Sequence, residues 1–319
     1  MLGFLRISGY SGAGAAIWRG EPLQVYIRHE WNGVYGMGMK FAVRAFVARS
    51  VKHLMGMVLY QSGLHRLAMP NCAIVVLFHR VNDRLGENEI SCTVKKFRDF
   101  CDFFKKYYKV ISYGELLRKL DRGENLRGHV VITFDDGYRD NEEVAAADLR
   151  KRGLTACFFI ITGFIGTDRV AWWDEEKGIK SEWMSWDSVR ALREQGFELG
   201  CHTVNHLDLG KVHGDEAQWE IEESKRKLEA ETGEKIPYFS YPYGGIDQCT
   251  EENRQRVRDL GFKTCPSAYG GVVPPGTDPF YIKRTSISQW YISPYHFGVD
   301  MMLLGRRAEP NDNLGDETS

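Results

Sequence analysis

From Asn71 onward, short apolar segments alternate with longer amphipathic ones, and this alternation constrains the fold more than any other feature of the chain. The short apolar segments, typical of buried strands, are 73–78, 129–134, 155–161 and 197–201, and further strands are expected at 109–112, 237–241, 262–265 and 280–288. The longer segments place apolar residues at helical spacing, as at 94–108, 185–196 and 215–233, and further helices are expected at 141–153 and 250–261. Strands that alternate with helices indicate βα units and a parallel sheet. A succession of about seven or eight such units favours a closed or nearly closed barrel over an open sheet.

The 319-residue chain is long enough for one barrel-type domain with flanking segments, and we expect the barrel to occupy residues 71–304. Residues 1–38 are Gly-rich, lack periodicity and are expected to form a poorly ordered leader; Met37 and Met39 are alternative starts. Residues 39–70 should form a basic, apolar helix. The polar residues 305–319 are expected to be a disordered tail.

Positive charge is concentrated at the N-terminal end. Residues 1–69 contain eight Lys or Arg and two Glu, whereas the whole chain has a formal net charge of −1. That overall balance gives no case for nucleic acid as a partner. Charges also interrupt residues 39–67 too often for a helix that crosses a membrane, which needs about 20 apolar residues. Peripheral contact with an anionic membrane surface and packing on the barrel both remain open for this helix.

The seven cysteines are scattered along the chain, odd in number and without a C-x-x-C pair. This pattern favours reduced thiols in a reducing compartment over disulfides or a zinc–cysteine site. No cleavage site typical of a signal peptide stands out. We therefore expect a cytoplasmic protein, with membrane association or a location outside the cytoplasm as alternatives.

Chemically active residues follow four of the predicted strands. The residues at these strand ends are His79, the pair Asp135 and Asp136, the pair His202 and His206, and the turn 242–245. In a barrel of parallel strands the carboxyl ends meet at one rim, where catalytic residues gather. We expect these side chains to converge there.

A metal ion accounts for this combination of residues. Histidines four positions apart on one helical face lie about 5–6 Å apart, so His202 and His206 could both reach one Zn²⁺ at about 2.0–2.1 Å. Asp136, from another strand, would complete a His₂Asp set with positions left open for water and substrate. The cation would offset the charge of Asp136, so that Asp135 beside it can stay ionised and accept a proton from water.

Three segments together resemble a known family. "TFDDGY" (133–138), "HTVNH" (202–206) and "YPYGG" (241–245), in this order, resemble the first three motifs of the polysaccharide deacetylases, carbohydrate esterase family 4 or NodB homology domain. The resemblance covers roughly residues 72–290. It implies a distorted (β/α)₇ barrel of the NodB type, here with an N-terminal helical extension. It also implies a hydrolase that uses a divalent metal, with Zn²⁺ expected and Co²⁺ or Ni²⁺ as alternatives.

The resemblance also assigns roles to residues. It implies that Asp135 is the base, that Asp136, His202 and His206 bind the metal, and that the backbone N–H of Tyr243 helps to hold the oxyanion. The substrate would be an N-acetylated sugar polymer or glycolipid. Three further residues are expected to contact it: Pro242 and Gly244 in the turn, and Trp186 at the end of a tryptophan-rich segment, for which core packing is the alternative.

Two positions depart from the family pattern. The third motif usually begins with an arginine five residues before its proline, but Pro237 stands there, and Arg284 is a possible replacement. The late Leu-x-His motif that supplies the general acid is also missing. "LFHRV", around His79, resembles an early segment of the poly-N-acetylglucosamine deacetylase branch. We therefore expect His79 to protonate the leaving amine, with His296 as the alternative.

These departures keep two other functions open. A small-molecule amidohydrolase that opens cyclic amides or ureides would share the fold and the metal. A glycan-binding module without activity would explain the missing arginine and the missing late histidine.

Overall fold

The structure is a computed structural model that describes residues 35–308. The expected leader, residues 1–38, therefore lies almost wholly outside the described residues, as does the tail from 309 onward. The prediction of a disordered tail from residue 305 was wrong for residues 305–308, which belong to helix α10 (Pro294–Ala308). The buried face of α10, which includes Phe297, Met301 and Gly305, continues at helical spacing to that point.

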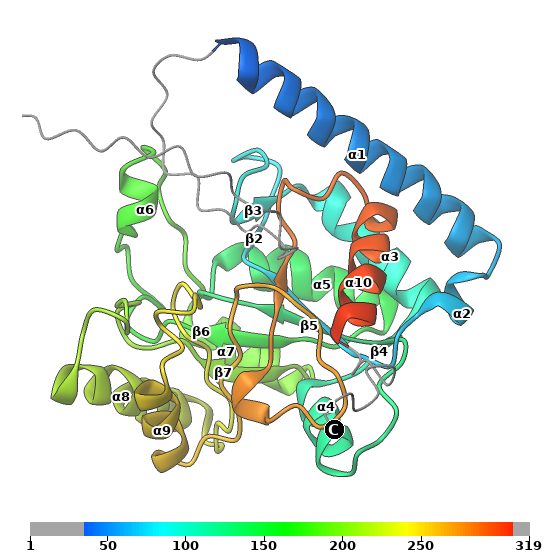
Figure 1. Ribbon diagram of the computed structural model, residues 1–319. Helices are drawn as coiled ribbons and strands as arrows, with labels where there is room; N and C mark the ends of the chain where they lie inside the picture. Colours follow the sequence, from blue (N-terminus) through cyan, green and yellow to red (C-terminus); the bar gives the residue numbers. More distant parts are fainter. Residues whose placement is uncertain (1–34, 309–319) are drawn as a thin grey trace, which may run out of the picture. The chain divides into compact units, whose positions relative to one another are not determined.

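A parallel sheet forms the centre of the fold (Figure 1). Strand β1 (Ile74–Phe78) lies between β5 (His129–Phe134) and β8 (Thr285–Ser286). Strand β6 (Cys157–Ile160) joins β5 to β7 (Glu198–Cys201), and the short β4 (Lys109–Val110) pairs with the start of β5. These strands lie within the predicted segments, and all are largely buried except β4, which is exposed at Lys109.

The sheet closes into a ring through segments that are barely strands. Segment 237–241 lies beside β7, segment 264–270 lies beside 237–241, and segment 282–286 joins 264–270 to β1. The links are the parallel bridges Cys201–Phe239 and Tyr238–Thr264, the hydrogen bond from Gly270 N to Arg284 O (3.0 Å), and the β1–β8 pairing. The predicted distorted (β/α)₇ barrel is confirmed. The strands predicted over 237–241, 262–265 and 280–288 are much shorter than expected.

Helices surround this ring. The predicted helices are present as α3 (Val94–Tyr107), α7 (Trp186–Glu194), α8 (Gly214–Thr232) and α9 (Glu251–Asp259), and as a π-helical turn (Asn141–Ala146) that continues into α5 (Ala147–Arg152). Not predicted were α4 (Tyr113–Asp121), α6 (Trp172–Glu175), a 3₁₀ turn (Pro279–Tyr281), α10, and the paired strands β2 (Arg80–Val81) and β3 (Ser91–Cys92).

Alternation along the strands decides which residues face the barrel interior. Val75 and Val131 belong to one apolar cluster, whereas Val76 and Ile132 belong to another. Successive residues of a strand point to opposite faces. Counted in steps of two, His79 and Asp135 lie on the same side as Val75 and Val131, and the register pairs Phe78 with Phe134 immediately before them. The two residues therefore emerge side by side at the carboxyl end of the barrel.

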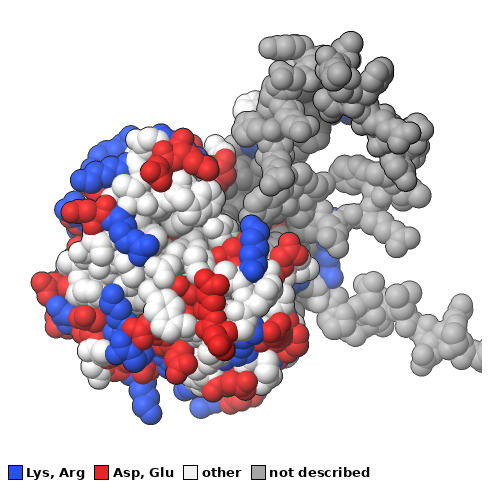
Figure 2. Space-filling model, turned by 90° about the vertical axis from the view of Figure 1, so that its left-hand side faces the viewer, with Lys and Arg blue, Asp and Glu red and all other residues white. Residues whose placement is uncertain are grey.

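The N-terminal helix α1 (Tyr35–Gln61) lies against α10 and is followed by the short α2 (His65–Ala68) (Figure 1). Among the described residues, no helix is long and apolar enough to cross a membrane. On the face of the molecule shown in Figure 2, acidic and basic side chains are interspersed wherever the surface is not drawn in grey.

Candidate metal centre

Asp136, His202 and His206 converge at the carboxyl ends of β5 and β7. Their candidate ligand atoms all lie within 4.8 Å of one another. Asp136 Oδ1 is 3.4 Å from His202 Nε2 and 3.5 Å from His206 Nε2. Two ligand atoms at about 2.0–2.1 Å from a tetrahedral ion are about 3.3–3.4 Å apart. The three side chains are thus spaced as ligands of one ion.

The backbone at this centre adopts an uncommon conformation. The non-glycine residues of the described chain with positive φ are Asp136 (77°), Thr203 (63°), His206 (57°) and Tyr243 (62°). All four lie in the three motifs that carry the family resemblance. A non-glycine residue in this region is held there against a cost of about 1–2 kcal/mol. The fold therefore imposes this geometry on all three motif loops.

The expectation that His202 and His206 share a helical face was wrong, because residues 202–206 form a loop. Glu220 of α8 holds this loop. Its Oε2 accepts hydrogen bonds from the backbone N–H groups of Val204 (2.9 Å) and Asn205 (2.8 Å), and its Oε1 accepts one from the Asn205 side chain (2.7 Å). The sequence did carry a signal for Glu220: it is an acid on the buried stripe of α8, beside Ile221.

The electrostatics of the three side chains fit a cation. Asp136 Oδ1 and His206 Nδ1 are buried without a hydrogen-bond partner among the described residues, although Asp136 Oδ1 faces two imidazoles. Burial lowers the pKa of His206 to about 3, so its imidazole is neutral and able to bind a metal. His202 Nδ1 lies 2.9 Å from the carbonyl oxygen of Ser240, and a proton held there would leave Nε2 free to bind a metal.

Two shifts of pKa show that a positive charge is favoured between these groups. Burial acts to lower the pKa of His202, but the carboxylates of Asp135 and Asp136 outweigh it and raise that pKa. Burial acts to raise the pKa of Asp136, yet the nearby imidazoles lower it. A proton on His202 Nε2 would lie between that nitrogen and Asp136 Oδ1, where a metal ion bound by both atoms would also lie. The residues present therefore fit a divalent ion.

Arg284, the candidate replacement for the missing motif arginine, pairs with Asp135. Its Nη1 and Nη2 each donate to one oxygen of Asp135, at 2.7 Å in both cases, and Nη2 also donates to Ser240 Oγ at 2.6 Å. Both partners of the pair are buried. Burial acts to raise the pKa of Asp135, but the guanidinium lowers it below its ordinary value. Asp135 is therefore held ionised and in one orientation.

Of the two histidines considered as the acid, His79 lies at this centre. It follows β1, and Asp136 and Asp135 act on its charge: burial lowers the pKa of His79, and the two carboxylates oppose that shift. Its backbone carbonyl accepts a hydrogen bond from Asn141 Nδ2 at 2.6 Å. His296 lies instead in α10, where its Nε2 is 3.3 Å from Asp300 Oδ2.

The motif turn brings its backbone close to the centre. Gly244 N donates to Pro242 O at 2.7 Å, which closes a three-residue turn around Tyr243. The ring of Tyr243 lies 5.0 Å from that of His206. Gly244 has a φ of 58°, and a Cβ there would lie 2.6 Å from the Cβ of Ala268, so glycine is required.

Two tryptophans line the centre, but Trp186 is not one of them. The ring of Trp173 is 4.6 Å from that of His206, and the ring of Trp172 is 6.5 Å from that of Tyr243. Trp186, expected to contact substrate, lies at the start of α7, partly buried against the main core, with Lys227 Nζ 5.4 Å from its ring. Its alternative role in core packing fits this position.

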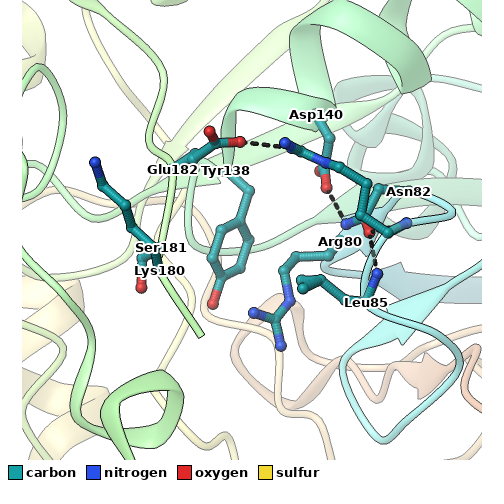
Figure 3. A pocket seen from close by; sticks show the side chains of 9 residues that line it. Arg80, Asn82, Leu85, Tyr138, Asp140, Lys180, Ser181 and Glu182 are labelled. Atoms are coloured by element: carbon teal, nitrogen blue, oxygen red, sulfur yellow. Dashed lines mark hydrogen bonds and ion pairs between the residues drawn. The ribbon is translucent and has the colours of Figure 1, made fainter. Parts of the chain in front are cut away.

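A polar cavity of about 170 Å³ adjoins the centre behind Tyr138 (Figure 3). Tyr138 links the two: its hydroxyl accepts a hydrogen bond from Trp173 Nε1 at 2.8 Å, and its ring is 5.1 Å from the Arg80 guanidinium. Arg80 is itself buried and donates to Asp174 at 2.6 Å. The cavity lining is polar and of mixed charge, with Arg80, Arg84, Lys180, Asp140, Glu182, Asn82 and Ser181 beside Tyr138 and Leu85. Sequence analysis did not identify it.

Comparison with known proteins gives a consistent result. Residues 122–265 match the model of the family described as "Polysaccharide deacetylase". YxkH of Bacillus subtilis (strain 168) is 27% identical over 140 residues, which are 44% of this chain and 46% of YxkH. The peptidoglycan-N-acetylmuramic acid deacetylase PdaA of the same organism is 21% identical over 47% of this chain and 52% of PdaA. The alignments thus span about half the length of these curated relatives.

Solved structures share the fold. The Streptococcus pyogenes deacetylase PplD, in complex with acetate, superposes with a TM-score of 0.61 at 22% identity, over 73% of this chain and 99% of PplD. IcaB from Ammonifex degensii superposes with a TM-score of 0.58 at 22% identity, over 71% of this chain and 97% of that one. The predicted family resemblance and the predicted fold are both confirmed.

Proposed function

We propose that this chain, in which residues 122–265 match the polysaccharide deacetylase family model, is a hydrolase that uses a divalent metal to remove N-acetyl groups from a sugar polymer or glycolipid. The observation that carries this proposal is the convergence of Asp136, His202 and His206 beside an ionised Asp135. Zn²⁺ is the proposed ion, because two imidazoles and one carboxylate form a typical catalytic zinc set.

The residues divide the reaction among them. A divalent cation bound by Asp136, His202 and His206 would polarise the acetyl carbonyl and make water more acidic. Asp135 takes the proton from the attacking water; each of its oxygens accepts one bond from Arg284, and Oδ1 keeps a further lone pair for that proton. The N–H of Tyr243 donates to the oxyanion, a contribution worth about 2.7–4 kcal/mol in comparable hydrolases.

His79 completes the reaction by giving a proton to the departing amine, so that acetate and a free amine result. Trp172 and Trp173 provide aromatic faces on which a sugar ring can stack, beside the turn of Pro242 and Gly244. An inactive glycan-binding module has lost part of its support, since Arg284 supplies the partner that the motif lacks.

Metal analysis and an acetate-release assay on an N-acetylglucosamine oligomer, with added Zn²⁺, test the proposal. Asp135→Asn should lower turnover by about 100-fold or more while it keeps the metal. Asp136→Asn should lose both. The opposite pattern would exchange the two roles, and release of acetate without any metal would refute the proposal.

The same assays separate the remaining alternatives. His79→Ala should slow the reaction with metal content intact; unchanged turnover would point to His296 or to water as the acid. Glycan binding without acetate release would support an inactive module. Hydrolysis of a cyclic amide or ureide, with none of the oligomer, would support the small-molecule amidohydrolase.

The proposed setting of this activity is the cytoplasm, with peripheral membrane contact through residues 39–67. The seven cysteines are all buried as free thiols, which fits a reducing compartment. Helix α1 lies outside the barrel and presents exposed apolar side chains. A glycolipid substrate would be encountered at such a surface.

A further inference from the structure

Helix α1 directs Lys52 and His53 toward the protein, where its Tyr60 is also buried among aromatic rings. Lys52 Nζ lies 2.5 Å from Oδ1 of Asp300 in α10. His53 Nδ1 lies 2.6 Å from Oγ of Ser293, which directly precedes α10. Gly56 allows the close approach of the two segments, because a Cβ there would lie 2.4 Å from the carbonyl oxygen of Tyr295. The helix is thus held on the barrel by charge, hydrogen bonds and close backbone contact.

The opposite side of α1 is apolar and faces solvent. Val47, Val51, Leu54 and Val58 follow one another at i, i+4, i+7 and i+11, and each is more than half exposed (52–65%). Phe46 and Met55 are exposed beside them. These six residues are named the α1 apolar face. A helix that only packs on a domain has the reverse arrangement, with its apolar stripe inside.

Exposed apolar side chains are concentrated at this end of the chain. Of the sixteen large ones on the described surface, eight lie between residues 46 and 67: the six of the α1 apolar face, and Leu64 and Leu67 after the end of α1. Single exposed apolar residues are normal, whereas a contiguous patch marks a surface that contacts a protein or a membrane.

Charge decides between these partners. Residues 31–70 contain no Asp or Glu, and the basic side chains of Arg44 and Arg66 are exposed toward the two ends of the face. A second copy of the chain would bring like charges together. Anionic lipid complements both the arginines and the apolar stripe. The α1 apolar face runs from Phe46 to Val58 and offers a docking line about 20 Å long.

We propose that the α1 apolar face docks onto an anionic lipid surface, with α1 lying in the plane of the interface. Six apolar side chains would enter the boundary between headgroups and acyl chains, and Arg44 and Arg66 would contact lipid phosphates. The inference does not depend on the deacetylase activity, because none of these residues lies at the metal centre.

Vesicle co-sedimentation of the full chain tests this docking. Wild-type protein should bind phosphatidylcholine vesicles that contain phosphatidylglycerol, and bind them less at high salt, where the charge term is screened. Replacing Val51, Leu54 and Val58 together by Ser should weaken binding about tenfold or more. Trp219→Ser on α8 is the matched control, since Trp219 is equally exposed (51%) but lies away from α1; it should bind as wild type.

Several outcomes would overturn the inference. They are wild-type protein that fails to bind the anionic vesicles, equal binding to pure phosphatidylcholine, or undiminished binding by the triple variant. A wild-type dimer that the triple variant converts to a monomer, without any vesicle binding, would assign the face to a second copy. Circular dichroism and acetate release from a soluble oligomer should be the same in both variants as in wild type, which separates loss of docking from loss of folding or of activity.

Discussion

Two buried arginine–aspartate pairs lie close to the metal centre. They differ in how many guanidinium nitrogens of the arginine donate to the aspartate. Arg284 donates from both terminal nitrogens to Asp135, at 2.7 Å each. Arg80 donates to Asp174 from Nη1 alone, at 2.6 Å, and its Nη2 has no hydrogen-bond partner among the described residues. Each aspartate also lies beside a serine hydroxyl, Ser240 in the first pair and Ser181 in the second.

The difference follows from the elements that carry the pairs. Asp135 ends β5 and Arg284 immediately precedes β8, so the closed ring of strands fixes both partners. Arg80 lies in the two-residue strand β2, and Asp174 lies in α6, a single turn in the long connection after β6. The rigid strand ends align Arg284 and Asp135 as a bidentate pair. The short elements that carry Arg80 and Asp174 align only one hydrogen bond to the carboxylate, so Arg80 Nη2 has no partner among the described residues; Arg80 also lines the cavity beside Tyr138.

The largest effect is expected for Arg284→Met. Asp135 would remain buried without its cation, which should lower the free energy of unfolding by about 3–5 kcal/mol and abolish acetate release. Urea denaturation and the acetate assay measure the two effects. Arg284→Lys is the matched variant: it keeps the charge but not the fork of donors, so it should recover part of the stability and little activity. Wild-type stability in Arg284→Met would show that the pair is not what orders this end of the barrel.

Arg80→Met should destabilise the protein less, by about 3 kcal/mol, at the low end of the range for a broken buried pair. Asp174 would keep its hydrogen bond from Ser181 Oγ at 2.7 Å. Metal content should not change, because Arg80 contacts none of the three candidate ligands. Urea denaturation with metal analysis checks this, and a loss as large as that of Arg284→Met would remove the distinction between the pairs.

Replacing both partners sharpens the comparison further. Arg80→Met combined with Asp174→Leu should return stability to within about 1–2 kcal/mol of wild type, since an apolar pair leaves no buried charge uncompensated. Arg284→Met combined with Asp135→Leu should also recover stability, but not turnover, if Asp135 is the base. With the single variants Asp174→Leu and Asp135→Leu included, denaturation of wild type, both single variants and the double variant forms a double-mutant cycle for each pair. Recovered turnover in the second combination would contradict the role given to Asp135.

The smallest effect is expected for the partly exposed pair Lys52–Asp300, where Lys52→Met should cost at most about 1 kcal/mol at neutral pH. Burial acts to raise the pKa of Asp300, but His296 and Lys52 lower it. The ionised Asp300 carboxylate therefore stabilises the fold at any pH above its unfolded pKa, about 3.9. This stabilisation is lost as the pH falls through the lower pKa that Asp300 has in the folded state. Wild type should lose more stability than Lys52→Met between pH 5 and pH 2, and parallel curves in thermal melts would contradict this.

The parts of the fold that the sequence predicted well are those with local signals. Strand β5 has the predicted bounds because its residues after His129 are uniformly apolar or β-branched and are followed by two carboxylates. Helix α8 differs from its prediction by one residue at each end, and Gly233 ends it in the left-handed conformation. The predicted strands that close the ring were too long, because the segments there pair mostly through single bridges.

The candidate site shows the same division. The sequence identified Asp135, Asp136 and the two histidines, because they follow strands whose ends must share one rim. It could not place residues that reach the site from distant segments. Glu220 is one of these, and Trp173 is another: it contacts His206, whereas Trp186, from the same tryptophan-rich segment, packs on the core.

The sequence by itself determined the main alternation of strands and helices, the residues at the strand ends and the kind of chemistry they can perform, because periodicity and residue type are local properties. Only the tertiary structure decided the partner of Asp135, the looped path between His202 and His206 and the outward direction of the apolar side of α1. Each of these depends on contacts between residues far apart in the chain: Arg284 is 149 positions from Asp135, and Lys52 is 248 from Asp300. Closure of the barrel brings such residues together, and no local pattern records which of them will meet.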